Sequence, residues 1–518
     1  MSTRESTETR TPGGVLVTTG GTPMSERARA LGAGVARTYI DGAWHDAATD
    51  ERWQHHHPAT GEADFTIGVS SADEVDRAVR AARRAFDEGP WPRMTARQRK
   101  LALQPLGELI RAHGPEFAQL QSLDNGVPIT VGSGFRFSAN FAADVFDYFT
   151  GWIDKLDGTA PPVYTEQINN QLITVKEPVG VVAAITPFNA PVMQFAQKVA
   201  PALAAGCTVV FKPSEYASNV AALYTRLIEQ LDLPAGVFNL VPGTASTSQA
   251  LVAHPLVDKV AFTGRRSVGE QILTAAAPGL KRVQLELGGK SPSIVFDDVE
   301  DITATAQYAM SLVSMGLSGQ LCSTQTRALV QRSVYDDFVA AAAAQIENVH
   351  LGDSFDPTVT SIPLVNPAAS DRVMQLIDGA VEEGAKPVAG GRRITVPGGG
   401  NWVEPTLFTD VTTDMEIARE EVFGPVLAAI PFDTEEEAIR IANDSEYGLS
   451  AGVYTRDTSR ALRVARRLRT GTVGVNSLFV ATPTAPFGGY KTSGLGREGG
   501  RDGLEGYLET KTISIPLD

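Results

Sequence analysis

Apolar segments of four to eight residues recur through the middle of the chain and alternate with segments of helical pattern. Each carries few polar side chains, which is typical of strands that are buried on both faces of a parallel sheet. With helices on both faces, such a sheet is doubly wound and binds its ligands at the carboxyl ends of the strands. The predicted strands are VGVVAAIT (179–186), CTVVF (207–211), VFNLV (237–241), KVAF (259–262) and VQLEL (283–287).

Helical periodicity appears before and between these strands. In the first helical segment, apolar residues recur at intervals of three or four between Val75 and Phe86, and either Ser71 or Asp73 can act as the N-cap. Further helices are predicted over 95–112, 138–156 and 218–231, and a second α/β stretch runs from about 291 to 491. The pattern therefore predicts an α/β protein with more than one domain.

Two polar segments differ from this pattern. Residues 159–177 alternate in the manner of a strand but contain little that could be buried, and the strand-like TKTISIPL (510–517) ends the chain. These segments can pair with each other. A polar ribbon of this kind does not stabilise itself, so we expect it to lean on another subunit.

Composition excludes several classes of partner. Lys and Arg number 45 against 60 Asp and Glu, a formal net charge of −15, so neither nucleic acid nor an anionic membrane is an expected partner. A chain of 518 residues with only two cysteines is typical of a reducing compartment, where proteins rarely depend on disulfides. Residues 1–36 are rich in Ser, Thr, Arg and Gly, and their longest apolar run, 15–17, is too short for a signal peptide or a membrane span. We expect a flexible tail there and a cytoplasmic protein.

Cys322 lies in GLSGQLCSTQTR (316–327), a stretch of glycines and polar residues that is poor core material. A lone cysteine is more often a buried, inert side chain than a nucleophile, so both interpretations stay open on the residues alone. Glu286 in LELGGKSP follows a predicted strand, and it is either a solvated carboxylate or a base that activates water. Cys207 begins an apolar strand and is expected in the core.

The segment FTGRRSVG is the better candidate for a phosphate-binding turn, because Gly264 and Gly269 flank a strand-to-helix connection. A plain tight turn is the alternative. Lys212 and Glu215 leave the end of another strand, where a carboxylate can accept hydrogen bonds from ribose hydroxyls. The consecutive histidines at 55–57 have no metal-ligand spacing, so we expect them at the surface and expect no metal.

Taken together, these stretches resemble the NAD(P)-dependent aldehyde dehydrogenase superfamily from about Thr38 to Ile515. The motifs occur in the family's order: TPFNAP (186–191), FKPSE (211–215), FTGRRSVG (262–269), LELGGKSP (285–292), GQLC (319–322), EEVFGP (420–425) and PFGGYKTSGLGRE (486–498). The resemblance implies a Rossmann-type cofactor domain (37–158 and 178–288), an α/β catalytic domain (289–492) and a small β oligomerisation arm (159–177 and 504–518).

The resemblance also implies roles for individual residues. Cys322 would attack the aldehyde carbonyl, Asn189 and the Cys322 backbone N–H would hold the oxyanion, and Glu286 would activate the hydrolytic water. Lys198 matches a lysine near the reacting centre. The implied cofactor-binding residues are Thr186, Pro187, Phe188, Lys212, Ser214, Glu215, Gly243, Phe262, Thr263, Gly264, Arg265, Gly269, Leu287, Glu421 and Phe423.

Within the family, Glu286 favours a hydrolytic enzyme over a CoA-acylating one, since acylating relatives characteristically lack a carboxylate there. Glu215 would repel a 2′-phosphate, which favours NAD over NADP, although Arg265 and Arg266 could contact phosphate. A catalytically silent family member is the remaining alternative, and the retention of Cys322, Glu286 and Asn189 argues against it.

The implied aldehyde channel lacks two of the rings common in the family, at Ala190 and Ala481, with polar contacts expected from Gln194 and Gln197. We therefore expect a bulky small-molecule substrate, namely an aromatic, terpenoid or medium-chain aldehyde, and a homodimer or homotetramer. The residues expected to line the channel are Ala190, Gln194, Ala481 and Phe487.

Overall fold

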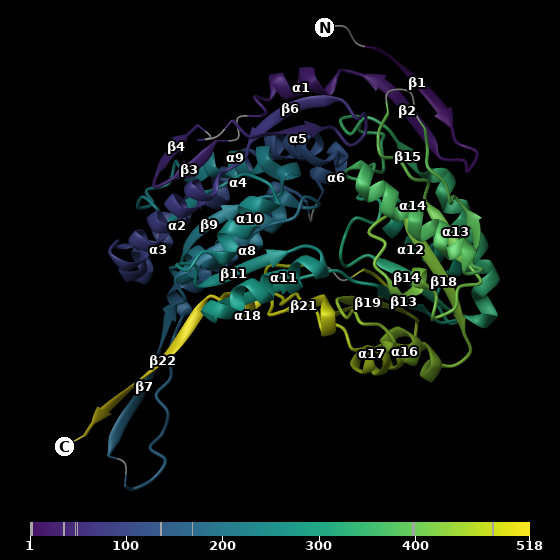
Figure 1. Ribbon diagram of the computed structural model, residues 1–518. Helices are drawn as coiled ribbons and strands as arrows, with labels where there is room; N and C mark the ends of the chain where they lie inside the picture. Colours follow the sequence, from purple (N-terminus) through teal and green to yellow (C-terminus); the bar gives the residue numbers. More distant parts are fainter. Residues whose placement is uncertain are drawn as a thin grey trace.

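The computed structural model describes residues 4–34, 37–46, 48, 50–134, 137–167, 169–395, 399–478 and 481–517. Two large sheets dominate it, each covered by helices on both faces, and they lie side by side with the segments that form the site between them (Figure 1). This is the α/β architecture that the alternation of apolar strands and helices predicts. None of the helices in the described ranges is long and apolar enough to cross a membrane.

The first sheet has eight strands in the order β21-β12-β11-β8-β9-β10-β3-β4. Its five central strands are parallel, and the chain winds outward from β8 first to β9 and β10 and then, on the other side, to β11 and β12. This reversal is the topological switch point of a doubly wound sheet, where a ligand crevice is expected. The strands are β8 (Val181–Ile185), β9 (Thr208–Lys212), β10 (Phe238–Leu240), β11 (Lys259–Thr263), β12 (Arg282–Glu286), β3 (Thr38–Ile40), β4 (Ala43–His45) and β21 (Gly494–Leu495).

Helices cover this sheet much as the apolar spacing predicts. Ser71, not Asp73, caps α2, and it does so in a capping box with Glu74. The single helix expected over 95–112 is two helices, because Pro105 has no backbone N–H to continue the first. The helices are α2 (Ala72–Asp87), α3 (Ala96–Leu103), α4 (Pro105–Ala112), α5 (Gly114–Asn125), α6 (Ile129–Gly132), α7 (Ala139–Trp152), α8 (Pro191–Ala205), α9 (Ser218–Ile228), α10 (Ala245–Ala253) and α11 (Arg266–Ala276).

The second sheet has seven strands in the order β16-β17-β18-β14-β13-β19-β20, all parallel except the edge strand β16. Separate apolar clusters lie on its two faces. The elements are β13 (Ser291–Val295), β14 (Gln325–Gln331), β16 (Lys386–Ala389), β17 (Thr406–Thr409), β18 (Val426–Phe432), β19 (Ser450–Tyr454), β20 (Thr472–Val475), α12 (Ile302–Ser314), α13 (Tyr335–Gln345), α14 (Pro367–Glu382), α15 (Glu416–Arg419), α16 (Glu435–Asn443) and α17 (Thr458–Arg467).

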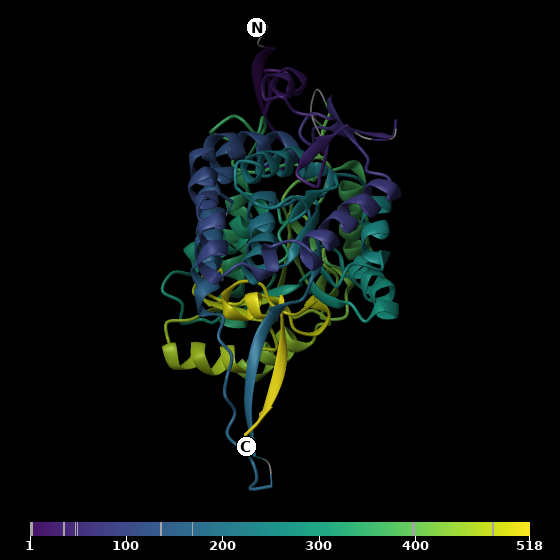
Figure 2. The same cartoon turned by 90° about the vertical axis from the view of Figure 1, so that its left-hand side faces the viewer.

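The two polar segments pair, as expected, into a two-stranded antiparallel ribbon of β7 (Asn170–Pro178) and β22 (Leu508–Pro516). The short helix α18 (Gly500–Glu505) leads into β22. Figures 1 and 2 show the ribbon projecting away from both sheets, at the opposite end of the molecule from the N-terminus. The apolar side chain of Ile513 is 38% exposed on it, so the ribbon leaves surface that a second subunit could cover.

The expected flexible tail over 1–36 is wrong for residues 4–34, and its other residues lie outside the described ranges. This segment forms β1 (Arg4–Arg10), β2 (Leu16–Gly21) and α1 (Met24–Ala30), and β2 pairs in parallel with β15 (His350–Leu351). Val15 and Val17 are buried against the second sheet's helices. The apolar run 15–17 is too short for a membrane span, but it contributes to a buried strand. The residues that bury it lie far along the chain, so the local composition does not reveal them.

The expectation of surface histidines at 55–57 is also wrong for two of the three. His55 and His57 are fully buried around β5 (Arg52–His56) and β6 (Ala63–Gly68), while His56 on the opposite face is exposed. His55 Nδ1 lies 2.7 Å from Asp64 Oδ1. Burial lowers the pKa of His57 to about 4, so this ring is neutral at physiological pH. Within the described ranges, no group of three or more His, Cys, Asp and Glu side chains could hold a metal ion.

Candidate active site

A cavity of about 500 Å3 opens at the carboxyl ends of the first sheet's strands, beside the switch point, and faces the second sheet. Its size is that of a small-molecule or cofactor site. Twelve of the predicted site residues line it: Pro187, Phe188, Asn189, Ser214, Glu215, Thr263, Gly264, Arg265, Leu287, Cys322, Glu421 and Phe423.

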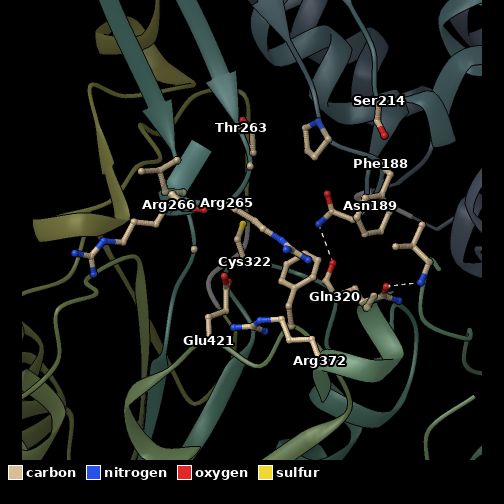
Figure 3. A pocket seen from close by; sticks show the side chains of 18 of the residues that line it. Phe188, Asn189, Ser214, Thr263, Arg265, Arg266, Gln320, Cys322, Arg372 and Glu421 are labelled. Atoms are coloured by element: carbon tan, nitrogen blue, oxygen red, sulfur yellow. Dashed lines mark hydrogen bonds between the residues drawn. The ribbon is translucent and has the colours of Figure 1, made fainter. Parts of the chain in front are cut away.

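Cys322 lies on the cavity wall, in the loop between α12 and β14 (Figure 3). Two glycines bring this loop close to its neighbours. Gly319 has φ +70°, and a Cβ there would lie 2.0 Å from the carbonyl oxygen of Gly424; a Cβ on Gly289 would lie 2.6 Å from the carbonyl oxygen of Cys322. The packing interpretation therefore fits Cys207, which is fully buried, whereas Cys322 is half-buried at a cavity.

The surroundings of Cys322 disfavour its thiolate in the unliganded protein. Burial raises the pKa of the Cys322 thiol above its usual value, and the carboxylates Glu421, Glu286 and Glu498 raise it further. The thiol therefore needs a base at the moment of reaction.

Asn189 follows β8 and precedes α8, and its side chain points toward Cys322's loop (Figure 3). Its Nδ2 donates a 2.8 Å hydrogen bond to the carbonyl oxygen of Gln320. One amide hydrogen is thereby used to orient the side chain, and the second remains for a ligand. Gln320 is in turn held by the Pro363 carbonyl oxygen and the Val365 N–H, so the donor is rigidly placed.

Glu286 ends β12 and is 2% exposed. Both of its carboxylate oxygens are buried without a hydrogen-bond partner among the described residues. Burial, and secondarily the charge of Glu498, raise its pKa well above the usual value. A buried carboxyl group of raised pKa is a stronger base than an ordinary carboxylate, and beside a thiol it can act as a general base in its ionised form.

Lys198 on α8 is fully buried and forms an ion pair with Glu498, which is 1% exposed. Its Nζ also donates a 2.7 Å hydrogen bond to Thr263 Oγ1 at the end of β11. The pair lies near Glu286, whose pKa both charges influence. Sequence reasoning did not single out Glu498, although it closes the GLGRE motif.

At one end of the cavity, Lys212 Nζ lies 3.8 Å from Glu215 Oε2, a carboxylate placed to accept hydrogen bonds from a diol. At the other end, Glu421 accepts a 3.0 Å hydrogen bond from the Gly289 N–H. Burial raises the pKa of Glu421 to about 7. A Cβ on Gly288 would lie 2.2 Å from Glu421 Oε2, so only glycine leaves room here.

Aromatic rings continue along the cavity between these two ends. The rings of Phe188 and Phe423 are 6.2 Å apart and nearly perpendicular, and Phe188 makes a similar contact with Tyr216. Phe423 has φ +54°, a strained conformation for a bulky residue that suggests a functional constraint. These rings provide apolar walls for a flat ligand group.

Eleven other predicted site residues do not line this cavity. Some support it from behind: Gly269 packs its helix against Leu287, and the Phe262 ring lies against Gly264. The Thr186 N–H bonds the Lys212 carbonyl oxygen across the strand ends. The residues concerned are Thr186, Lys198, Lys212, Gly243, Phe262, Gly269, Glu286, Ala190, Gln194, Ala481 and Phe487.

The cavity also has wall residues that the sequence did not reveal. Arg372 on α14 donates a 2.9 Å hydrogen bond to the Val422 carbonyl oxygen and contributes a cation beside Glu421. It lies on a helix with no recognisable motif, about fifty positions before the residues it meets, so no local signal marked it. Tyr216, in contrast, adjoins the FKPSE motif, and Gln320 lies within the GQLC motif, although neither was named as a site residue.

Comparison with known proteins adds to this geometry. Residues 44–513 match the model of the Aldehyde dehydrogenase family. The chain is 42% identical to Aldehyde dehydrogenase 1 of Tanacetum cinerariifolium, covering 93% of this chain and 95% of that protein. It is 39% identical to the mitochondrial succinate-semialdehyde dehydrogenase of Arabidopsis thaliana, covering 95% and 91%. The crystal structure of Staphylococcus aureus betaine aldehyde dehydrogenase in complex with NAD+ superimposes with a TM-score of 0.91 at 36% identity, covering 95% and 97%.

Proposed function

The chain belongs to the aldehyde dehydrogenase family and is an NAD-dependent oxidoreductase; from this premise we propose that it oxidises a bulky aldehyde to the carboxylic acid by thiol chemistry at Cys322. The observation that carries the proposal is the position of Cys322 on the cavity wall, close to the Asn189 amide and to a Glu286 carboxyl group without a partner.

The cavity fits NAD. Lys212 and Glu215 would hold the adenosine ribose, and Glu421, cradled by Gly288, would hold the nicotinamide ribose. Phe423 would pack beside the nicotinamide ring. When bound, NAD+ supplies the two-electron acceptor for the oxidation. The remaining chemistry belongs to the chain's own residues.

Cys322 Sγ attacks the aldehyde carbon once the ionised form of Glu286 has taken its proton. The raised pKa of Glu286 makes its carboxylate a stronger base, and the raised pKa of the Cys322 thiol is the reason that a base is needed. The developing oxyanion is held by the free Asn189 amide hydrogen and by the Cys322 backbone N–H. After oxidation the acyl group is a thioester on Sγ. Glu286 first releases the thiol proton to solvent and then takes a proton from water as the water oxygen attacks the thioester carbon. The Cys322 sulfur leaves as a thiolate, which takes that proton back from Glu286 as the carboxylic acid forms.

The substrate is a bulky aldehyde because the helix and loop that the family uses as an aldehyde channel carry small residues here. Ala190 is the N-cap residue of α8, and Ala481 lies on the loop before Phe487. Gln194, one turn along α8, is 6% exposed, and its Oε1 has no partner among the described residues. The names of the relatives give betaine aldehyde and succinate semialdehyde, so membership of the family alone does not fix the substrate.

A substrate panel tests this function. With NAD, we expect benzaldehyde or a C8 to C10 aldehyde to give at least tenfold higher kcat/KM than acetaldehyde, since each further buried CH2 contributes about 0.8 kcal/mol. Equal efficiency for acetaldehyde would refute the bulky substrate. CoA should not accelerate the reaction, and a CoA-dependent rate would favour the acylating alternative. NADP should give the lower kcat/KM.

The ribbon of β7 and β22 supports a homodimer or homotetramer, because a protruding two-stranded sheet with exposed apolar side chains needs a partner surface. A cytoplasmic location fits the two free thiols. Light scattering of the purified protein tests the oligomer, and a monomer at micromolar concentration would refute it.

A further inference from the structure

Two of the three consecutive histidines at 55–57 are fully buried, although the proposed reaction does not use them. Side chains two positions apart share one face of an extended chain, so His55 and His57 both turn toward α5. Figure 1 shows α5 next to β6, the strand that pairs with β5. The two rings contact the same helix, but their ring nitrogens meet different partners.

His57 is a neutral ring. Its Nδ1 accepts a 3.3 Å hydrogen bond from the Ala59 N–H, so this nitrogen carries no proton. Its Nε2 donates to the Ser122 carbonyl oxygen at 3.1 Å. One donor and one acceptor are what a neutral imidazole offers, and burial, which lowers the pKa of His57 to about 4, agrees with this assignment.

Both ring nitrogens of His55, in contrast, face acceptors. Nδ1 lies 2.7 Å from Asp64 Oδ1, and Nε2 lies 2.7 Å from the Asp124 carbonyl oxygen. Asp64 Oδ1 also accepts a 2.9 Å hydrogen bond from the Phe65 N–H, as an ionised carboxylate can. A neutral imidazole has only one N–H and would leave one of the two short contacts without a proton. The geometry therefore indicates a proton on each nitrogen of His55, which makes the ring an imidazolium.

The charges around the ring also favour a cation. The side chains of Asp64 and Asp124 are fully buried, and a buried negative charge is costly unless a positive charge or several donors accompany it. Among the described residues, the other cation near these rings is Arg27 on α1, which is paired with Asp353. His55 is therefore the cation that balances Asp64.

Aromatic rings enclose the imidazole and connect it to the cavity. Phe65 is stacked on it with the ring centroids 4.3 Å apart, and the face of an aromatic ring attracts a cation. Trp53 and Tyr216 meet it edge to face, each with a centroid distance of 5.6 Å. Tyr216, whose pKa burial raises so that it stays uncharged, lines the cavity beside Glu215. The His55 ring therefore supports this part of the cavity wall directly.

A second route to the cavity runs through the last turn of α5, whose carbonyl oxygen the imidazolium holds. The Asp124 carboxylate accepts 3.1 Å hydrogen bonds from the backbone N–H groups of Asn219 and Val220 and so caps the first turn of α9. The next residue, Asn125, donates a 2.6 Å hydrogen bond from Nδ2 to the carbonyl oxygen of Phe188, which lines the cavity. The end of α5 thus fixes two segments of the cavity wall.

We propose that His55 is a positioning residue for cofactor binding: as a buried imidazolium it ties the β5–β6 hairpin to α5 and so holds Tyr216 and Phe188 in the cavity wall. His55 touches neither the cofactor nor the reacting atoms. The proposal rests on the proposed function only in that the cavity binds NAD. It does not depend on the identity of the aldehyde or on the roles of Cys322 and Glu286.

Nitrogen-15 NMR tests the charge of the ring in the full-length protein, labelled at its seven histidines. The variants His55→Gln and His57→Gln identify the two sets of ring signals. At neutral pH we expect both nitrogens of His55 to be protonated, and His57 to show one protonated and one unprotonated nitrogen. A His55 ring with a single proton would overturn the proposal.

NAD binding and steady-state kinetics of the same two variants test the positioning role. The Gln amide offers one donor group and one acceptor, which matches the partners of His57 but not the two acceptors that face His55. His57→Gln should bind NAD as the wild type does. His55→Gln should raise the dissociation constant of NAD about fivefold, part of the free energy of one charge-assisted hydrogen bond. Because Cys322, Asn189 and Glu286 are unaltered, kcat at saturating NAD should stay within about twofold of the wild type.

A third variant, Asn125→Ala, tests the route through α5. It should also weaken NAD binding, and the double variant with His55→Gln should lose less affinity than the sum of the two single losses, because both act on the same segment. Unchanged NAD binding in His55→Gln, an equal loss in His57→Gln, or a loss confined to kcat would overturn the proposal. If His55→Gln does not fold, the wild-type NMR spectrum and the NAD affinity of Asn125→Ala still decide it.

These outcomes are separate from those of the proposed function. If no aldehyde is oxidised but NAD binding weakens in His55→Gln and not in His57→Gln, the positioning role stands and the catalytic proposal fails. If aldehydes are oxidised and all variants bind NAD equally, the reverse holds. Circular dichroism of each variant at the assay temperature shows that it is folded.

Discussion

Replacement of Glu286 by Gln separates the two halves of the proposed reaction. The amide has the volume of the carboxyl group but cannot take a proton from water. Asn189 and Cys322 are untouched, so the thioester still forms, but more slowly than in the wild type, because Glu286 also takes the thiol proton. Hydrolysis of the thioester loses its general base, which contributes about 100- to 10,000-fold to the rate of such a step. The acyl enzyme therefore accumulates.

The structure indicates that the protein should tolerate this change. Neither carboxylate oxygen of Glu286 has a partner among the described residues, so no hydrogen bond is lost. The amide leaves two buried N–H groups unpaired where the neutral carboxyl group left one O–H, and the free energy of unfolding should fall by about 3 kcal/mol or less. Loss of a buried acid with a strongly raised pKa offsets part of this cost.

Stopped-flow absorbance at the NADH band measures the outcome. Glu286→Gln should show a burst of about one NADH per subunit, followed by a steady-state rate lowered about 100-fold or more. Cys322→Ala, the control, should bind NAD but give neither burst nor turnover. A Glu286→Gln enzyme with the wild-type steady-state rate would refute the assignment of the base, and residual turnover in Cys322→Ala would refute that of the nucleophile.

Three further predictions follow from other parts of the molecule. Val17→Ala should lower stability by about 2 kcal/mol, seen as a lower unfolding temperature, because the side chain is 1% exposed and two buried carbons are removed; an unchanged temperature would mean that β2 does not stabilise the fold. Burial raises the pKa of Glu421 to about 7, so its ionised fraction rises with pH and NAD affinity should increase about tenfold from pH 6 to pH 8, whereas Glu421→Gln should show a flat profile. Ile513→Asp on the exposed ribbon should reduce the molar mass in light scattering, and an unaltered oligomer would place the subunit contact elsewhere.

The strands of the first sheet and its doubly wound class were predictable because a parallel sheet buried on both faces leaves continuous apolar runs. Val181–Ile185 and Lys259–Thr263 are buried along their whole length, as those runs indicate. The division of the 95–112 helix at Pro105 was missed, although a proline inside a helical pattern is a known signal for it. The N-terminal strand was not, because Val15 and Val17 are buried by helices more than 280 residues away.

The residues of the site also fall into two groups, those that the sequence identified and those that only the structure revealed. Motif residues such as Cys322, Asn189 and Glu215 were recognisable because the chemistry of a thiol ester and of a dinucleotide restricts which side chains can stand there. Arg372 was missed because it lies on α14, a helix that packs on the second sheet. The spacing of apolar residues in α14 indicates which side of the helix is buried, but not which residues face the cavity. The channel lining and the roles of the site residues stay predictions.

The sequence by itself determined the fold class, the chemical types at the site and the family, because apolar periodicity and motif residues are local properties. Only the tertiary structure decided which charges meet. Lys198 and Glu498 are 300 positions apart and pair within the protein. Arg265 and Arg266 are adjacent, yet among the described residues only Arg266 forms ion pairs, with Glu270 and Glu446. The spacing of apolar residues along the chain indicates which side chains are buried. Which residue a charged side chain pairs with depends on how elements that are distant in the sequence pack together.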